Sequence, residues 1–268
     1  MPKKILFVHI PKTGGIYLQK LIESNALGAS IGHFSLHDIC AQNKRALLSR
    51  FLHKAEESLG QDSLDEISSL IRTGHKLNGP ENNYVVCTAI RNPYAWYKSL
   101  YQYFVRRNFG NCICGILARM EWEHFIDLVT SREKISVFNE KHHDFFRPGD
   151  LFENMVRDYG SCRLDIGLYS FIVLSLVFVR DVFNYSVDEI ADNSEQLTLI
   201  DKAYVLKTEQ LSADFLNLVG DSENRLHLKN INSSPNRSPD LVTMSSAQRS
   251  LIYQQDNLIF KIFDYVEN

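Results

Sequence analysis

A lysine, a threonine and two glycines stand together directly after an apolar segment, and these residue types can bind an anion. Lys12, Thr13, Gly14 and Gly15 follow the apolar run 5–10. Glycines let the backbone approach a ligand closely, and the N–H groups at a helix N-terminus favour negative charge. The pattern predicts a phosphate-type site, although a plain turn with a surface lysine has the same shape. It is not a Walker A loop, because the sequence GxxxxGK[ST] is absent.

Arg91 and Ser99 form a second candidate set. Arg91 follows the apolar run 84–90, and Ser99 comes eight residues later. The carboxyl end of a strand is where ligands collect in open α/β sheets, and a guanidinium group matches phosphate oxygens in pairs. These residues predict a contact to a second phosphate, with a structural arginine that bonds a helix end as the alternative.

Positive charge is concentrated in three segments that contain no acidic residue. These are 1–20, 91–107 and 224–237, which leave the rest of the chain strongly acidic. If the predicted topology brings all three to one edge of a sheet, they form a focused pocket for anions.

Strands and helices must bring these residues together. The apolar runs 5–10 and 84–90 predict strands that are buried on both faces, as in a parallel sheet, and 203–207 predicts a third. Strands that alternate with helices predict a three-layer α/β domain with a mainly parallel sheet. We expect helices or helical stretches at 17–22, 38–73, 94–107, 212–219 and from a capping box at Ser245–Gln248, and a loop at 220–243. Residues 110–200 predict a mostly helical insertion within one domain, 1–268.

The composition is that of an ordinary globular protein. The chain has 268 residues, a formal charge of −3 and 44% hydrophobic residues, which disfavours disorder and non-specific nucleic-acid binding. Five cysteines, an odd number without a CxxC pair, predict a reducing compartment. Cys112 and Cys114 are a possible redox or metal pair, but ordinary loop cysteines explain them as well, and no metal site is predicted.

The sequence predicts no contact with a membrane. The apolar run 171–179 is far shorter than the ~20 residues that span a bilayer, and it predicts a buried helix or a dimer face. The first residues lack the pattern of a signal peptide, so a cytoplasmic location is expected.

Two segments together resemble a known family. HIPKTGG at 9–15 and AIRNPYAWYKSLYQYF at 89–104 resemble the sulfotransferases that use 3′-phosphoadenosine 5′-phosphosulfate (PAPS), and most of all the carbohydrate-type and bacterial branch. The likeness continues weakly through 207–211, 230–238 and the final helix, and 110–200 is unmatched. The resemblance implies a P-loop-like sulfotransferase fold and a reaction that releases 3′-phosphoadenosine 5′-phosphate (PAP).

The resemblance also implies roles for individual residues. Lys12 would contact the phosphosulfate and stabilise charge on the leaving phosphate oxygen. The other nucleotide contacts that it implies are Thr13, Gly14 and Gly15 at the 5′-phosphate, Arg91 and Ser99 at the 3′-phosphate, and a closing loop that ends at Arg237.

Two positions depart from the family pattern. Ile16 stands where the family usually has a hydroxyl side chain, so one expected contact is missing. Tyr17 aligns with a tryptophan of the cytosolic branch, and it could stack on adenine or belong to the core.

A catalytic base is expected among the histidines. Sulfuryl transfer is an in-line displacement, and an acceptor hydroxyl benefits from a base with a pKa near 7. His33, in the segment GHFSLHD at 32–38, resembles the family's catalytic histidine, and His37 and His75 are alternatives. The family's chemistry implies no metal.

The predicted function is therefore transfer of a sulfuryl group from PAPS to a hydroxyl of a carbohydrate-like or other small-molecule acceptor, in a bacterial cytoplasmic enzyme. A P-loop-like nucleotide-dependent kinase is one alternative, which Mg²⁺ dependence would separate. A non-catalytic nucleotide-binding relative is the other, and Ile16 motivates it. The acceptor and the oligomeric state are not set by the sequence.

Overall fold

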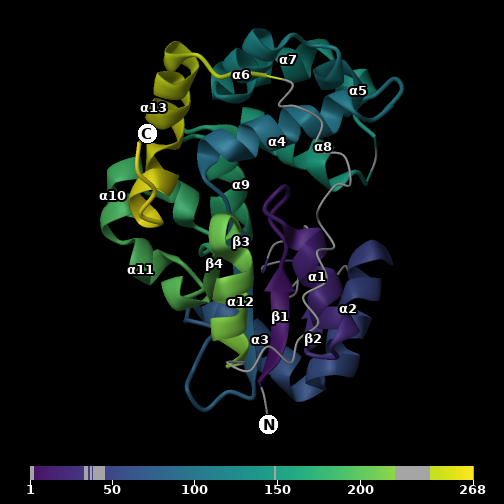
Figure 1. The fold of residues 1–268 in the computed structure, drawn as a ribbon, viewed down its shortest axis with the longest axis vertical. Helices are drawn as coiled ribbons and strands as arrows, with labels where there is room; N and C mark the ends of the chain where they lie inside the picture. Colours follow the sequence, from purple (N-terminus) through teal and green to yellow (C-terminus); the bar gives the residue numbers. More distant parts are fainter. Residues whose placement is uncertain are drawn as a thin grey trace. The chain divides into compact units, whose positions relative to one another are not determined.

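The chain forms two compact units in a computed structural model that describes residues 3–32, 36, 38, 46–147, 149–220 and 242–267 (Figure 1). Each unit is assembled from three separate stretches of sequence. The first comprises Met1–Arg91, Leu174–Val182 and Glu195–Arg237, and the second comprises Asn92–Val173, Phe183–Ser194 and Ser238–Asn268.

The first unit contains a four-stranded sheet in which all neighbouring strands are parallel. Its strands are β1 (Lys4–Val8), β2 (Gly28–Ser30), β3 (Tyr84–Ile90) and β4 (Val205–Lys207), in the spatial order β2-β1-β3-β4. The strands predicted at 5–10, 84–90 and 203–207 are confirmed. β2 was not predicted. Its first position requires glycine, because the backbone of β1 lies very close to it. A Cβ on Gly28 would lie 1.8 Å from the carbonyl oxygen of Ile5.

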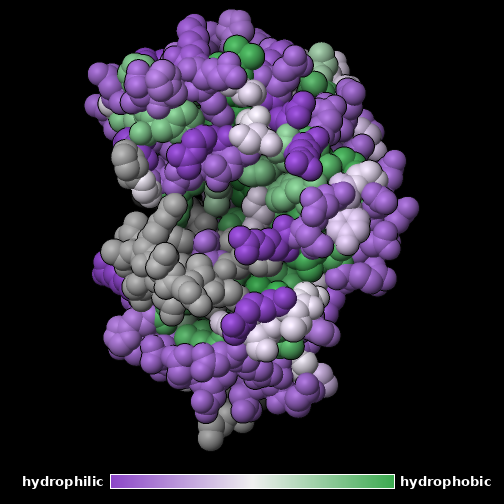
Figure 2. All heavy atoms as spheres, turned by 180° about the vertical axis from the view of Figure 1, so that it is seen from behind, coloured by the Kyte–Doolittle hydropathy of each residue, from purple (hydrophilic) through white to green (hydrophobic). Residues whose placement is uncertain are grey.

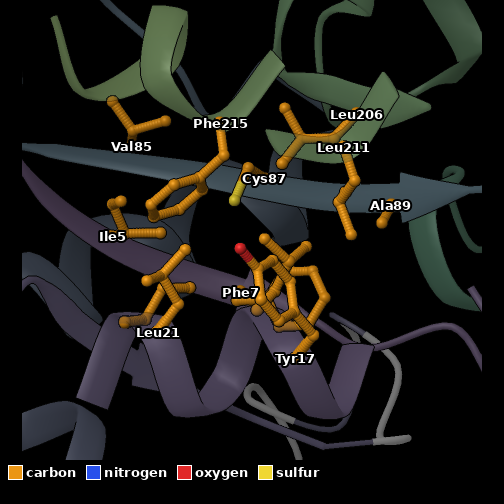
Figure 3. Close-up of a cluster of buried hydrophobic side chains, with 12 residues drawn as sticks. Ile5, Phe7, Tyr17, Leu21, Val85, Cys87, Ala89, Leu206, Leu211 and Phe215 are labelled. Atoms are coloured by element: carbon orange, nitrogen blue, oxygen red, sulfur yellow. The ribbon is translucent and has the colours of Figure 1, made fainter. Parts of the chain in front are cut away.

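Helices flank this sheet, a layering compatible with a three-layer α/β fold. On one face, side chains of β1 and β3 pack against α1 (Gly15–Ser24) and α12 (Leu211–Val219), as Figure 3 shows for Phe7, Cys87, Tyr17 and Phe215. Residues that alternate with these, such as Leu6 and Val86, are also fully buried, so the second face is covered as well. Two further helices of the first unit are α2 (Ala46–Leu59) and α3 (Gln61–Thr73), which are separated at Gly60 within the region predicted to be helical.

The second unit is helical among its described residues. The predicted helix at 94–107 is α4 (Pro93–Val105), and the capping box at Ser245 starts α13 (Ser246–Ile262), as expected. The helices between them confirm that 110–200 is mostly helical. They are α5 (Ile113–Ala118), α6 (Trp122–Val129), α7 (Arg132–Lys141), α8 (Leu151–Gly160), α9 (Leu168–Val177), α10 (Val187–Asp192) and α11 (Ser194–Leu197). The first unit includes α9 from Leu174 onward and α11 from Glu195 onward. Nearly every residue of α9 is buried, which favours a core helix over an exposed dimer face.

One buried carboxyl group organises the second unit. Asp256 is fully buried and lies where α13 is interrupted, with non-helical backbone angles. Its Oδ1 accepts hydrogen bonds from the backbone N–H and the hydroxyl of Ser170 at 2.8 and 2.7 Å, and its Oδ2 accepts one from the Tyr97 hydroxyl at 2.7 Å. Because Ser170 stands in the first turn of α9, Asp256 caps that helix from another segment. Gly167 makes room for it, since a Cβ there would lie 2.4 Å from the carboxylate.

The described surface is largely polar. On the face drawn in Figure 2, hydrophilic residues (purple) cover most of the described part. None of the described helices combines the length and the apolar character needed to span a membrane.

Candidate functional site

The candidate anion site lies where β1 and β3 end side by side. The chain passes from β1 through α1 to β2 on one side of β1, and it later returns to place β3 on the other side. The carboxyl ends of two such strands form the topological switch point at which open α/β sheets bind ligands. Here β1 leads into the turn 9–14, and β3 leads into Arg91. The structure brings one residue of each predicted set into contact, because Nη1 of Arg91 donates to the carbonyl oxygen of Lys12 at 3.4 Å.

The turn after β1 has an unusual backbone. Lys12 has a φ of 65° and Gly14 a φ of 81°. The left-handed conformation costs a residue with a Cβ about 1–2 kcal/mol, and such strain clusters at functional sites. Gly15 is required for another reason: a Cβ there would lie 1.7 Å from the ring of His9, which is buried and stacked on Phe7.

Three consecutive carbonyl groups of this turn accept hydrogen bonds from the protein itself. The carbonyl of Lys12 accepts from Arg91, that of Thr13 accepts from the Thr208 hydroxyl at 2.9 Å, and that of Gly14 accepts from the first turn of α1. In a planar trans peptide the C=O and the following N–H point in opposite directions. The N–H groups of Thr13, Gly14 and Gly15 are therefore directed away from these partners.

Several of these N–H groups remain available for a ligand. Within the described part of the chain, the backbone N–H groups of Gly14, Gly15 and Ile16 have no hydrogen-bond acceptor. A left-handed residue followed by a helical one makes adjacent N–H groups converge into an anion-binding nest, and the dipole of the ten-residue α1 adds to it. The half-buried Lys12 places a positive charge in the same turn.

Two residues of the predicted site have positions that the sequence left open. The hydroxyl of Thr13 is buried and donates to the carbonyl oxygen of Ile10 at 2.8 Å. Thr13 can therefore contribute its backbone N–H, and not its hydroxyl, to ligand binding. Tyr17 is 7% exposed and belongs to the cluster of apolar side chains in Figure 3. This position favours the core alternative over stacking on adenine.

The other predicted site residues are placed less fully. Ser99 lies half-buried on α4, in the second unit, and its part in the site stays a prediction. His33, His37 and Arg237 lie outside the described residues. Gly32, directly before His33, accepts a hydrogen bond at its carbonyl from the N–H of His9 at 3.0 Å. The chain thus leaves β2 at the same edge of the sheet as the turn that contains Lys12.

His75 starts a segment that leads to the other edge of the sheet. It is exposed, follows the Gly74 cap of α3 and precedes the first residue of β3. Lys3, just before β1, donates to the carbonyl oxygen of Gly79 at 3.2 Å, which fixes this segment at the amino ends of the strands. This arrangement disfavours His75 as the base.

The expectation that each acid-free segment gathers at the site is wrong for the first one. Lys3 bonds to Gly79, and Lys4 donates to the carbonyl oxygen of Ala26 at 2.8 Å. Both contacts lie at the amino edge of the sheet, because β1 starts there. Within this segment the structure places Lys12 in the candidate site, whereas Lys20 is exposed on α1.

One group of possible metal ligands lies in the described part of the second unit. Cys114, Asp150 and Glu153 have ligand atoms within 4.8 Å of one another. A cation is already present there, because the guanidinium of Arg147 contacts Glu153 at 3.0 Å and Asp150 at 2.6 Å. Burial raises the pKa values of Cys112 and Cys114, so neither thiol is activated as a nucleophile.

Comparisons with known proteins identify no relative of this chain. No protein-family model, curated protein or solved structure matches this chain. The functional argument therefore rests on the geometry of the turn 9–16 with Arg91 and Thr208, and on the two motifs of the sequence.

Proposed function

We propose that this protein is a sulfotransferase that uses PAPS as its donor and a hydroxyl of a carbohydrate-like or other small molecule as its acceptor. The observation that carries the proposal is the turn of Lys12–Ile16 at the switch point of β1 and β3, in which Arg91 contacts the Lys12 carbonyl and the N–H groups of Gly14, Gly15 and Ile16 have no acceptor among the described residues. A PAPS molecule carries anionic groups at both its 5′ and 3′ positions, and two separate sets of donors suit it.

In this proposal each residue has a defined task. PAPS supplies a sulfuryl group whose bond to the 5′-phosphate oxygen breaks as the acceptor oxygen attacks in line. The backbone N–H groups of Gly14 and Gly15 hold the 5′-phosphate, and Lys12 stabilises the charge that develops on its leaving oxygen. Arg91 binds the 3′-phosphate. His33 removes the proton of the acceptor hydroxyl.

A thermal-shift comparison of PAP with ATP and ADP, with and without Mg²⁺, tests which nucleotide the protein binds. We expect PAP at ~100 times its Kd to stabilise the protein by ~2.7 kcal/mol without Mg²⁺, which raises Tm by about 5–10 °C. A shift that needs ATP and Mg²⁺ would favour the kinase alternative. No shift with any nucleotide would refute the proposal.

Lys12→Ala tests the role of the turn, with Lys20→Ala as a matched control. Both variants remove one positive charge from the same βα unit, but Lys20 is exposed farther along α1. We expect Lys12→Ala to abolish transfer while the protein stays folded, and Lys20→Ala to retain it. A wild-type protein that binds PAP but transfers no sulfuryl group to any hydroxyl acceptor would indicate the non-catalytic alternative.

A further inference from the structure

Thr208 connects three segments of the first unit through one hydroxyl group. It follows β4 and begins the short 3-10 helix Thr208–Gln210. Its Oγ1 lies 2.9 Å from the carbonyl oxygen of Thr13 and 2.7 Å from that of Ile90. The sequence marked this residue only as part of the segment 207–211, without a role for its hydroxyl.

Both carbonyl groups belong to peptides that are important for the candidate site. The Thr13 carbonyl and the N–H of Gly14 belong to one peptide group. The Ile90 carbonyl and the N–H of Arg91 belong to another. Because the two ends of a planar trans peptide point in opposite directions, a contact to the carbonyl also fixes the direction of the N–H. One hydroxyl, whose single proton is shared between the two carbonyl oxygens, thus links the turn after β1 to the start of the segment after β3.

Packing supports the same arrangement. A Cβ on Gly14 would lie 2.9 Å from Cδ2 of Leu211 and 3.8 Å from Cγ2 of Thr208. The turn therefore lies directly against the junction between β4 and α12. A side chain at position 14 would push the turn away from this junction.

We propose that Thr208 is the positioning residue of the anion-binding turn: its hydroxyl holds the Gly14 N–H in the direction that a phosphate group requires. The residue does not need to touch the nucleotide for this. The effect on PAP rests on the proposed function, whereas the effect on the turn itself does not.

The test compares Thr208→Val, which removes the hydroxyl, with Thr208→Ser, which keeps it. Thr198→Val is the matched control, because the Thr198 hydroxyl also lies between two backbone carbonyls of the first unit, those of Val177 at 3.4 Å and Ile200 at 3.0 Å. The first readout is the ¹⁵N order parameter of the Gly14 and Gly15 amides without any ligand. We expect a value of about 0.85 in the wild type, Thr208→Ser and Thr198→Val, and a fall toward about 0.6 in Thr208→Val.

The second readout is the affinity for PAP. We expect Thr208→Val to weaken PAP binding about fivefold to tenfold, with Thr208→Ser close to the wild type. Unchanged order parameters in Thr208→Val would overturn the positioning role, and so would a loss of order of the same size in Thr198→Val. If the wild type does not bind PAP, the proposed function fails, and the order parameters still decide the role of Thr208.

Discussion

Asp256 should make the stability of the protein depend on pH in a direction opposite to that of most carboxyl groups. Burial raises the pKa of Asp256 from 3.8 to about 6, although hydrogen bonds from Ser170 and Tyr97 favour the charged form. Between these two values the folded protein holds a proton that the unfolded chain has released. The free energy of unfolding therefore falls as the pH rises through this range.

The size of the effect follows from the shift. About two pKa units at 1.36 kcal/mol each give a loss of about 3 kcal/mol from this group between pH 4 and pH 7. The neighbouring tyrosines do not contribute there, because burial raises the pKa values of Tyr97 and Tyr159 above 10.

The variant Asp256→Asn isolates the contribution of Asp256 to the pH dependence of the free energy of unfolding. Asparagine has nearly the same size, and its Oδ1 can accept from Ser170, but it has no proton to release. Denaturant unfolding of both proteins at pH 4 to 7 gives the difference in stability, in which the other titrating groups cancel. We expect the variant to gain about 3 kcal/mol relative to the wild type across this range. A difference that stays constant within about 0.5 kcal/mol would refute the argument.

Three further substitutions test the two units. Arg91→Ala should weaken binding of PAP far more than that of adenosine 5′-phosphosulfate, because only PAP has a 3′-phosphate; calorimetric titration measures both. Gly15→Ala should abolish PAP binding, since the new Cβ would lie 1.7 Å from the ring of His9 and one of them must move. Arg147→Ala should lower the unfolding free energy by about 3 kcal/mol, because it leaves the buried carboxylate of Glu153 without its cation.

For each of these three predictions, one result would contradict the reasoning. Equal losses for the two nucleotides in Arg91→Ala would remove the 3′-phosphate assignment. Wild-type affinity in Gly15→Ala would show that the nest does not bind the ligand. For Arg147→Ala the control is Arg157→Ala, whose exposed pair with Asp158 should contribute within 0.5 kcal/mol. Equal losses in both would mean that burial of Glu153 is not the cause.

The long periodic elements could be predicted because their signal is local. β1 and β3 are continuous apolar runs, and the capping box of α13 is contained in four residues, Ser245–Gln248. β2 has three small residues, Gly28–Ser30, and no apolar alternation that would indicate a strand. The break between α2 and α3 falls at Gly60, where a φ of 89° ends a helix that apolar spacing alone would continue.

The candidate site could be predicted in part for the same reason. Lys12, the glycines and Arg91 stand at strand ends that the sequence marks clearly. The position of Lys4 at the opposite edge follows from where β1 begins, which a count of charges in a segment does not use. Thr208 lies in the segment 207–211 that weakly resembles the family, but its contact with Thr13 could not be predicted, because it joins residues 195 positions apart.

That separation of 195 residues also has a consequence for the synthesis of the protein. A ribosome adds about 5–20 residues per second, so Thr208 emerges roughly 10–40 s after the turn that it contacts. During this time the turn between β1 and α1 exists without the Thr208 hydroxyl that contacts it in the complete protein. Because Thr208 comes after about three quarters of the chain, a nascent fragment that ends before it carries the complete HIPKTGG motif but has no Thr208 hydroxyl to contact the Thr13 carbonyl.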